Sequence, residues 1–153
     1  MIIQYRPILK VDTCTIKDEK NEQLPQFLQS DINQVSFCYG VNLKNIGRGE
    51  AQNGKIEEVK FNSDKISLLI SKVNHFIIVG ESETIMLQGQ INNLNKNSEI
   101  FQIYIKYLYK DLFNNINYIY IHVTIEFKKN SKDLFEMDLD VYTSYNNLLD
   151  SFI

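Results

Sequence analysis

The segment VSFCYGVNLKNIGRGEA, Val35 to Ala51, carries the clearest fold signal in this sequence. Apolar side chains stand at every second position of its first half, at Phe37, Tyr39, Val41 and Leu43. Successive side chains of a strand point to opposite faces, so this period of two predicts a strand with one buried face. The strand runs into Asn45-Ile46-Gly47-Arg48-Gly49, where two glycines allow positive φ angles and therefore predict a sharp turn.

The same alternation recurs along most of the remaining sequence. The strongest hairpin pairs Phe101–Tyr107 with Ile119–Phe127, and a third alternating run, Phe135–Val141, follows it. Further strands are predicted at three places, which are residues 2–12, 54–61 and 84–91. About eight strands with polar turns between them, and no helical pattern between successive strands, favour an antiparallel β-sandwich. A small closed β-barrel is the alternative, because alternation alone does not distinguish the two.

Four segments depart from simple alternation. The apolar pattern breaks between Ile56 and Val59, which predicts a β-bulge. Residues 66–70 and 76–79 are short apolar runs, and they predict either a hairpin or a short helix followed by a strand. The polar stretch Thr13–Gln34 is expected to be a long loop with a helical turn near Gln26–Leu28. Leu148–Ile153 predicts a short C-terminal helix or a packed tail.

Composition places the chain among ordinary globular proteins. Its 153 residues, 44% hydrophobic and 23% charged, fit one domain spanning residues 1–153. The formal net charge of −3 argues against a general nucleic-acid binder, which usually has a basic excess. No run of about 18 apolar residues is long enough to span a bilayer, and no secretory signal follows Met1. We therefore expect the chain as given to be soluble, with the cytoplasm favoured over export.

Four short motifs together suggest a family. The pattern N-x-G-x-G-x-A at Asn45–Ala51 follows an alternating strand, and RPILKV (Arg6–Val11), GES (Gly80–Ser82) and YKDLFNN (Tyr109–Asn115) lie before and after it. Over about residues 5–128 this combination resembles bacterial immunoglobulin-like β-sandwich domains, some of them adhesion modules and others the soluble domains of membrane-anchored proteins. The resemblance implies an immunoglobulin-like sandwich. It also implies either the soluble part of a membrane-tethered protein or a free-standing form, because the hydrophobic helix that usually precedes the RP stretch is missing here.

The residues that commonly carry catalysis or bind metals are scarce. His75 and His122 are the two histidines, and no GxSxG motif supplies a nucleophile beside them. Cys14 and Cys38 lie outside any CxxC motif, so a zinc site is not predicted; we favour two unpaired thiols and leave a disulfide open. We therefore expect neither an enzyme nor a bound metal or cofactor.

Three acidic residues share one face of a predicted strand. They are Glu136, Asp138 and Asp140, and their carboxylates could attract calcium. A solvated outer face is the favoured interpretation, because like charges on an exposed strand also discourage pairing with other chains.

The polar side of the main hairpin is the candidate binding surface. Opposite its aliphatic side lie five residues with the chemistry of protein interfaces, namely Tyr104, Lys106, Tyr118, Tyr120 and His122. Tyrosine offers a large rigid contact area with a polar tip and is enriched at interfaces. The alternative is that these rings pack under residues 13–34 or pair across strands without a binding role.

These observations predict a non-enzymatic binding, sensory or scaffolding domain that acts through contacts with a protein partner or a second copy of itself. On this hypothesis, replacing Tyr104 and Tyr120 with serine leaves the fold intact and weakens association. The alternative is a small β-barrel that holds a small ligand, such as a nucleotide signal.

Overall fold

The computed structural model describes residues 6–11, 27–72 and 76–145. All regular secondary structure in these residues is β-strand, and within them there is no helix of the length and hydrophobicity that crossing a membrane requires. The ten strands are β1 (Leu9–Val11), β2 (Phe27–Asp31), β3 (Gln34–Asn45), β4 (Ala51–Phe61), β5 (Ile66–Lys72), β6 (Phe76–Ile77), β7 (Ser82–Ile91), β8 (Ser98–Lys110), β9 (Ile116–Lys129) and β10 (Phe135–Ser144).

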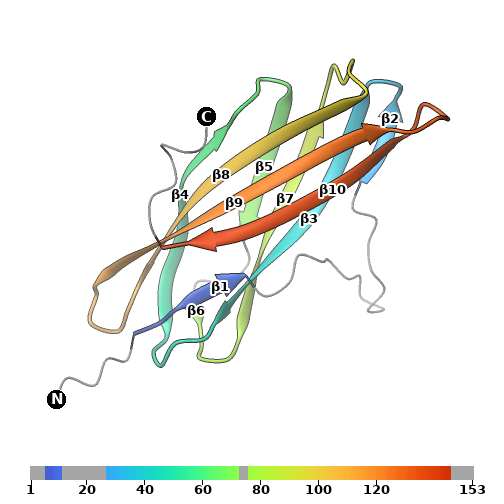
Figure 1. The fold of residues 1–153 in the computed structure, drawn as a ribbon. Coiled ribbons are helices and arrows are strands. Elements are labelled where there is room, and N and C mark those ends of the chain that lie inside the picture. The colour runs from blue at the N-terminus through green and yellow to red at the C-terminus, as the bar shows by residue number, and fades with distance from the viewer. Residues whose placement is uncertain (1–5, 12–26, 73–75, 146–153) are drawn as a thin grey trace.

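The strands form two antiparallel sheets that pack face to face as the two layers of a sandwich (Figure 1). One sheet has the order β1-β3-β7-β5, with β2 also paired to β3, and the other has the order β10-β9-β8-β4-β6. Each described sheet ends in edge strands, so neither closes on itself. The predicted antiparallel sandwich is confirmed, and the closed-barrel alternative is wrong.

Strand β2 is a feature that the sequence pattern did not predict. It lies in the stretch expected to form a polar loop with a helical turn at Gln26–Leu28, and that expectation is wrong over residues 27–31. Phe27 pairs with Phe37 of β3, and its ring packs edge-on against Phe127 of the other sheet, with 6.4 Å between ring centroids. Backbone pairing and packing across the sheets therefore override the local preference for a turn.

The segments around β5 and β6 adopt neither of the two expected arrangements. β5 pairs with β7 in one sheet, whereas β6 pairs with β4 in the other, so the chain crosses between the layers here. The predicted bulge is confirmed, because the register of β4 on β8 shifts between Ile56 and Glu58. Residues 148–153, where a helix or tail was expected, lie outside the described residues.

The hydrophobic core lies between the two sheets. The four apolar positions predicted in β3, Phe37, Tyr39, Val41 and Leu43, are each at most 7% exposed. Alternate residues of β8 and β9 close the core from the opposite layer, among them Ile103, Ile105, Tyr107, Ile119, Ile121 and Val123. The period of two in the sequence thus corresponds directly to the inner faces of the sandwich.

Asn45, the last residue of β3, joins three parts of the chain at one end of the sandwich. Its side chain is fully buried. The Nδ2 group donates hydrogen bonds to the carbonyl oxygens of Gly49 and Ile77, at 2.8 and 2.9 Å. Oδ1 accepts hydrogen bonds from the amides of Gly47 and Ile8, at 3.0 and 3.3 Å. A buried amide with this many partners satisfies the backbone groups of the surrounding turns.

The predicted turn after β3 is present, but Gly47 is needed there because a side chain would not fit, and not because its φ angle is positive. Among the described glycines, Gly80 is the one with a positive φ, of 83°. A Cβ atom on Gly47 would lie 2.2 Å from the carbonyl oxygen of Arg6 and 2.4 Å from the amide nitrogen of Ile8. Gly47 is therefore required because the N-terminal segment crosses directly over it.

Candidate functional site

The five residues predicted to form a binding surface lie on one face of the second sheet. β8 and β9 pair so that Tyr104 stands opposite His122 and Lys106 stands opposite Tyr120. Their chain neighbours, such as Ile105 and Ile121, belong to the core, so the five side chains occupy the outer face.

The centre of this face is closed to solvent. Tyr104 is 1% exposed, His122 5% and Tyr120 8%, whereas Tyr118 is 36% exposed and Lys106 is half-buried. Of the five residues, Tyr118 and Lys106 are therefore the ones that a partner could contact from solvent. Serine at Tyr104 and Tyr120 would remove buried ring area, and this burial contradicts the expectation that such a variant leaves the fold unaffected.

Ring packing across neighbouring strands occupies the buried centre. The rings of Tyr104 and Tyr120 stack with 6.0 Å between centroids and an interplanar angle of 24°. His122 Nδ1 forms a hydrogen bond with the hydroxyl of Tyr142 on β10, and the two rings meet edge-on at 4.8 Å. These are the cross-strand pairs that stabilise a sheet, as the alternative interpretation of the rings expected.

The same packing changes the titration of these groups. Burial raises the pKa of Tyr104 to about 12, and the neighbouring Tyr120 and Glu58 add to the effect. Burial lowers the pKa of His122, and the carboxylate of Asp140 partly opposes that change. Both groups are therefore neutral in the folded protein near neutral pH.

The accessible side of the predicted face continues from Lys106 to Tyr118. The Lys106 ammonium lies 4.4 Å from the centroid of the Tyr118 ring and 3.5 Å from Oε1 of Glu57. Its charge is thus held over an aromatic face and beside a carboxylate. This part of the face is ordered and faces solvent.

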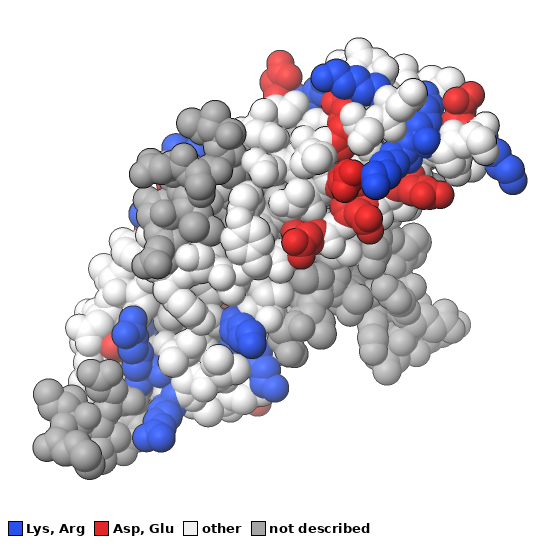
Figure 2. All heavy atoms as spheres, in the orientation of Figure 1, with Lys and Arg blue, Asp and Glu red and all other residues white. Residues whose placement is uncertain are grey.

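The acidic residues of β10 lie at the opposite end of the same face. Glu136, Asp138 and Asp140 are all exposed. Figure 2 shows acidic atoms gathered where β9 ends and β10 begins, with basic atoms beside them. Within the described residues, no group of three or more histidine, cysteine or acidic side chains is placed to hold a metal ion. Cys38 is a free, half-buried thiol, while Cys14 and His75 lie outside the described residues.

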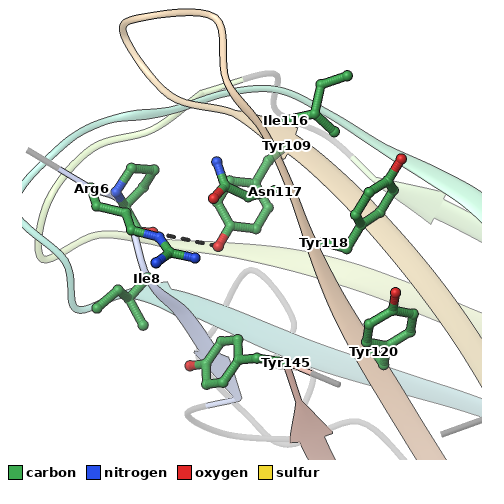
Figure 3. A pocket seen from close by; sticks show the side chains of 9 residues that line it. Arg6, Ile8, Tyr109, Ile116, Asn117, Tyr118, Tyr120 and Tyr145 are labelled. Carbon is green, nitrogen blue, oxygen red and sulfur yellow. Dashed lines mark hydrogen bonds between the residues drawn. The ribbon is translucent and has the colours of Figure 1, made fainter. Parts of the chain in front are cut away.

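A pocket of about 420 Å³ opens beside Tyr118, and we call it the tyrosine pocket (Figure 3). Figure 3 shows the segment Arg6–Ile8 on one side, β9 on the other and Tyr145 at one end. The lining residues come from parts of the chain far apart in sequence, which are Arg6, Pro7, Ile8, Tyr109, Ile116, Asn117, Tyr118, Tyr120 and Tyr145.

Two tyrosine hydroxyls fasten the N-terminal wall of the pocket. Tyr109 donates a hydrogen bond to the carbonyl oxygen of Pro7 at 3.4 Å, and Tyr145 donates one to the carbonyl oxygen of Leu9 at 2.9 Å. Burial raises the pKa of Tyr109 to about 12, and Tyr145 adds to this while Arg6 opposes it. Both hydroxyls therefore remain protonated donors at physiological pH, so the pocket is formed before any ligand arrives.

The rim of the pocket is accessible, unlike the centre of the face. Ile116 is 55% exposed, Tyr145 54%, Ile8 37% and Tyr118 36%. The floor is formed by the buried side chains of Tyr109 and Tyr120. A rigid floor with an apolar and aromatic rim suits the insertion of a side chain or a small molecule.

Most residues that line the tyrosine pocket were not predicted from the sequence. Tyr118 and Tyr120 were among the predicted site residues. Arg6 and Tyr109 belong to two of the motifs on which the family resemblance was based, but nothing in the pattern indicated that these segments, about a hundred positions apart, meet. Tyr145 carried no signal at all. Comparison of the chain with protein-family models and with curated proteins gives no match.

Proposed function

We propose that this chain is a non-enzymatic binding domain that holds a protein partner at the tyrosine pocket. The observation that supports it most is the pocket itself, a fixed cavity with an accessible aromatic and apolar rim. The proposal moves the contact surface along the predicted face, from its closed centre to the end near Tyr118. It keeps the immunoglobulin-like kinship as a hypothesis, for which a β-sandwich is the required architecture.

The chemistry of the pocket fits a protein partner. Tyrosine and arginine are enriched among the few residues that supply most of the binding energy at protein interfaces. Here Tyr118, Tyr145 and Arg6 surround a preformed cavity, and the exposed Ile116 adds apolar area at its edge. An anchoring side chain of the partner would fill the cavity, while the surrounding rings exclude water from it. Little ordering is needed on this side of the interface, because hydrogen bonds already fix the walls.

Site-specific photocrosslinking tests the proposal. A photoreactive phenylalanine analogue replaces Ile116 at the pocket rim in one variant and Ile100 in the other, in cells that produce the protein. The two positions are matched, because both are isoleucines on the outer face of the sheet and both are 55% exposed. We expect a discrete protein adduct from position 116 and none from position 100. Equal adducts from both positions, or none from either, would contradict the proposal.

A ligand screen by thermal unfolding tests the small-molecule alternative. A compound that raises the melting temperature of the native protein, but not that of a Tyr118→Ser/Tyr145→Ser variant, would assign the pocket to a small ligand. We expect no such compound, and we expect the variant to lose the adduct formed from position 116.

A further inference from the structure

Three turns and the segment before β1 meet at one end of the sandwich, which we call the loop end. They are residues 6–8, 45–50, 78–81 and 111–116, at the lower left of Figure 1. Backbone hydrogen bonds join the first three: Arg48 N donates to Arg6 O at 3.1 Å, Ile46 N to Ile8 O at 2.8 Å, and Gly80 N to Asn45 O at 2.9 Å. Pairing of Gln52 with Lys110 brings the β8–β9 turn to the same end.

The loop end exposes an unusual amount of large apolar surface. Phe113 is the most exposed large hydrophobic residue in the described chain, at 72%. Leu112 beside it is 55% exposed, and every one of the four segments contributes at least one more such residue, from the set Ile8, Ile46, Ile78, Val79 and Ile116. Single exposed apolar residues are ordinary, but a group drawn from four neighbouring segments indicates a contact surface.

The β8–β9 turn presents Leu112 and Phe113 on a rigid support. The carboxylate of Asp111 accepts hydrogen bonds from the amides of Phe113 and Asn115 and from the Asn115 side chain, each at 2.9 Å. The amides of Asp111 and Asn114 are bonded to carbonyls within the same turn, both at 3.1 Å. The amides of Asp111, Phe113, Asn114 and Asn115 are thus already hydrogen-bonded, which lowers the cost of moving the tip into an apolar medium.

Basic side chains lie at the same end of the sandwich as this apolar tip. Arg6 and Arg48 are exposed, and Lys44 and Lys110 are half-buried at the same end. The acidic residues of these segments are Glu50, Glu81 and Asp111, and the Asp111 carboxylate accepts hydrogen bonds within its own turn. Figure 2 shows basic atoms at the lower left around uncharged surface, while acidic atoms concentrate at the upper right. Acidic atoms are therefore few on this face of the loop end, whereas acidic and basic atoms lie together at the upper right of Figure 2.

We propose that the loop end docks on an anionic lipid bilayer, with Leu112 and Phe113 inserted at the interface. An apolar tip with cations at the same end of the molecule matches a surface of anionic headgroups above hydrocarbon. Tyr118 and Tyr145 lie behind the tip, and tyrosine rings favour the level of the headgroups. This surface shares Arg6, Ile8 and Ile116 with the tyrosine pocket, whereas Leu112 and Phe113 do not line the pocket, so variants of these two residues test lipid docking separately from partner binding.

The absence of tryptophan from the chain allows a direct test. A Phe113→Trp variant carries a single tryptophan at the tip, and a Leu134→Trp variant carries one in the β9–β10 turn, where Leu134 is 50% exposed at the opposite end. With vesicles of phosphatidylcholine mixed with phosphatidylserine, we expect the fluorescence of the Phe113→Trp variant to shift to the blue and to be quenched by brominated lipid. The fluorescence of the Leu134→Trp variant should show neither the shift nor the quenching. Vesicles of phosphatidylcholine alone, or high salt, should weaken the response.

A second pair of variants separates insertion from folding. Leu112→Ser/Phe113→Ser removes side chains that are largely exposed, so its melting temperature should match that of the native protein, while its affinity for the anionic vesicles should fall at least about tenfold. Ile100→Ser/Leu134→Ser changes two similarly exposed residues at the other end and should bind the vesicles normally. The proposal would be overturned if the fluorescence of the Phe113→Trp variant did not respond to vesicles, or if the Phe113→Trp and Leu134→Trp variants responded equally. A response of the tip to a protein partner but not to vesicles would also overturn it.

Discussion

Asn45 and Gly47 stabilise the loop end by different means. The Asn45 side chain satisfies backbone groups of the 45–50 turn, of Ile77 and of Ile8 at once, and no apolar residue could do so. Gly47 contributes by having no side chain, since the carbonyl oxygen of Arg6 occupies the space that a Cβ atom would need. Two positions of one motif, Asn45 and Gly47, thus require their residue types for hydrogen bonding and for close approach, respectively.

Replacing Gly47 with alanine should destabilise the protein by about 2 kcal/mol or more, because the backbone of Arg6 and Ile8 must move. Urea unfolding measures the change in the free energy of unfolding. Gly80→Asn is the control, because no atom lies within 4 Å of the added Cβ and asparagine tolerates a positive φ. The control should cost less than about 1 kcal/mol, and an equal loss in both variants would contradict the role given to Gly47.

His122 should make stability depend on pH below neutrality. Its pKa in the folded state is lowered, chiefly by burial, so the unfolded chain takes up a proton more readily. Its contribution is complete above the ordinary histidine pKa of about 6.5 and is lost as the pH falls towards the folded pKa, with a slope of at most about 1.4 kcal/mol per pH unit. Urea unfolding from about pH 7 to about pH 5 measures this.

A His122→Gln variant isolates the effect from His75. The variant should lose less stability than the native protein over the same pH interval. Identical pH dependence of the two proteins would show that His122 is not the group responsible.

The β8–β9 hairpin shows which structural features an alternating pattern predicts and which it does not. Alternation correctly separated its inner residues, such as Ile105 and Ile121, from its outer ones, such as Tyr104 and His122. It could not show that the outer rings would be closed to solvent, because their burial depends on partners such as Tyr142 that another strand supplies. A period of two assigns a side chain to a face but does not report whether that face is covered.

Replacing Asp111 with alanine should remove hydrogen bonds from the turn of this hairpin and make the turn open more often. Amide hydrogen exchange at Phe113 and Asn115 should become about tenfold faster, because both amides lose their carboxylate acceptor. Asn130→Ala is the matched control, since Asn130 Oδ1 accepts hydrogen bonds from Lys132 and Leu134 in the β9–β10 turn. The control should accelerate exchange in its own turn and leave Phe113 and Asn115 unaffected.

The same turn should respond to acid. Burial tends to raise the pKa of Asp111, but hydrogen bonds from Asn115 and Phe113 outweigh it and hold the pKa below its ordinary value. The stabilisation is present above the ordinary aspartate pKa of about 3.9 and is lost as the pH falls through the folded pKa. Protection of these amides, corrected for the intrinsic pH dependence of exchange, that is unchanged well below about pH 4 would contradict this.

Across the whole molecule, the layers were predictable and the pocket was not. The sandwich follows from apolar alternation, because each buried face must meet another. The tyrosine pocket depends on the approach of Arg6, Tyr109 and Tyr145, which are separated by most of the chain. Contacts between residues so far apart are set by strand order and sheet packing, and a single sequence contains no periodic signal for them.

The pocket and the surface that we propose to bind partners both lie at one end of the sandwich. The centre of the outer face is filled by stacked rings, the acidic end is solvated, and the tyrosine pocket and the loop end lie together at the remaining end. If this is correct, binding of the partner should protect some surface residues from solvent and leave others, only a few positions away, exposed. Tyr142 and Tyr145 are such a pair, at 44% and 54% exposed.

Hydroxyl-radical footprinting of these tyrosines is the most direct measurement. Oxidation of each side chain is compared between the purified protein and the protein in extracts of the cells that produce it. We predict that Tyr118 and Tyr145 become protected in the extract while Tyr142 stays as reactive as in the purified protein. Protection of Tyr142 without Tyr145, or equal reactivity of all three in both samples, would contradict the assignment of binding to the tyrosine pocket.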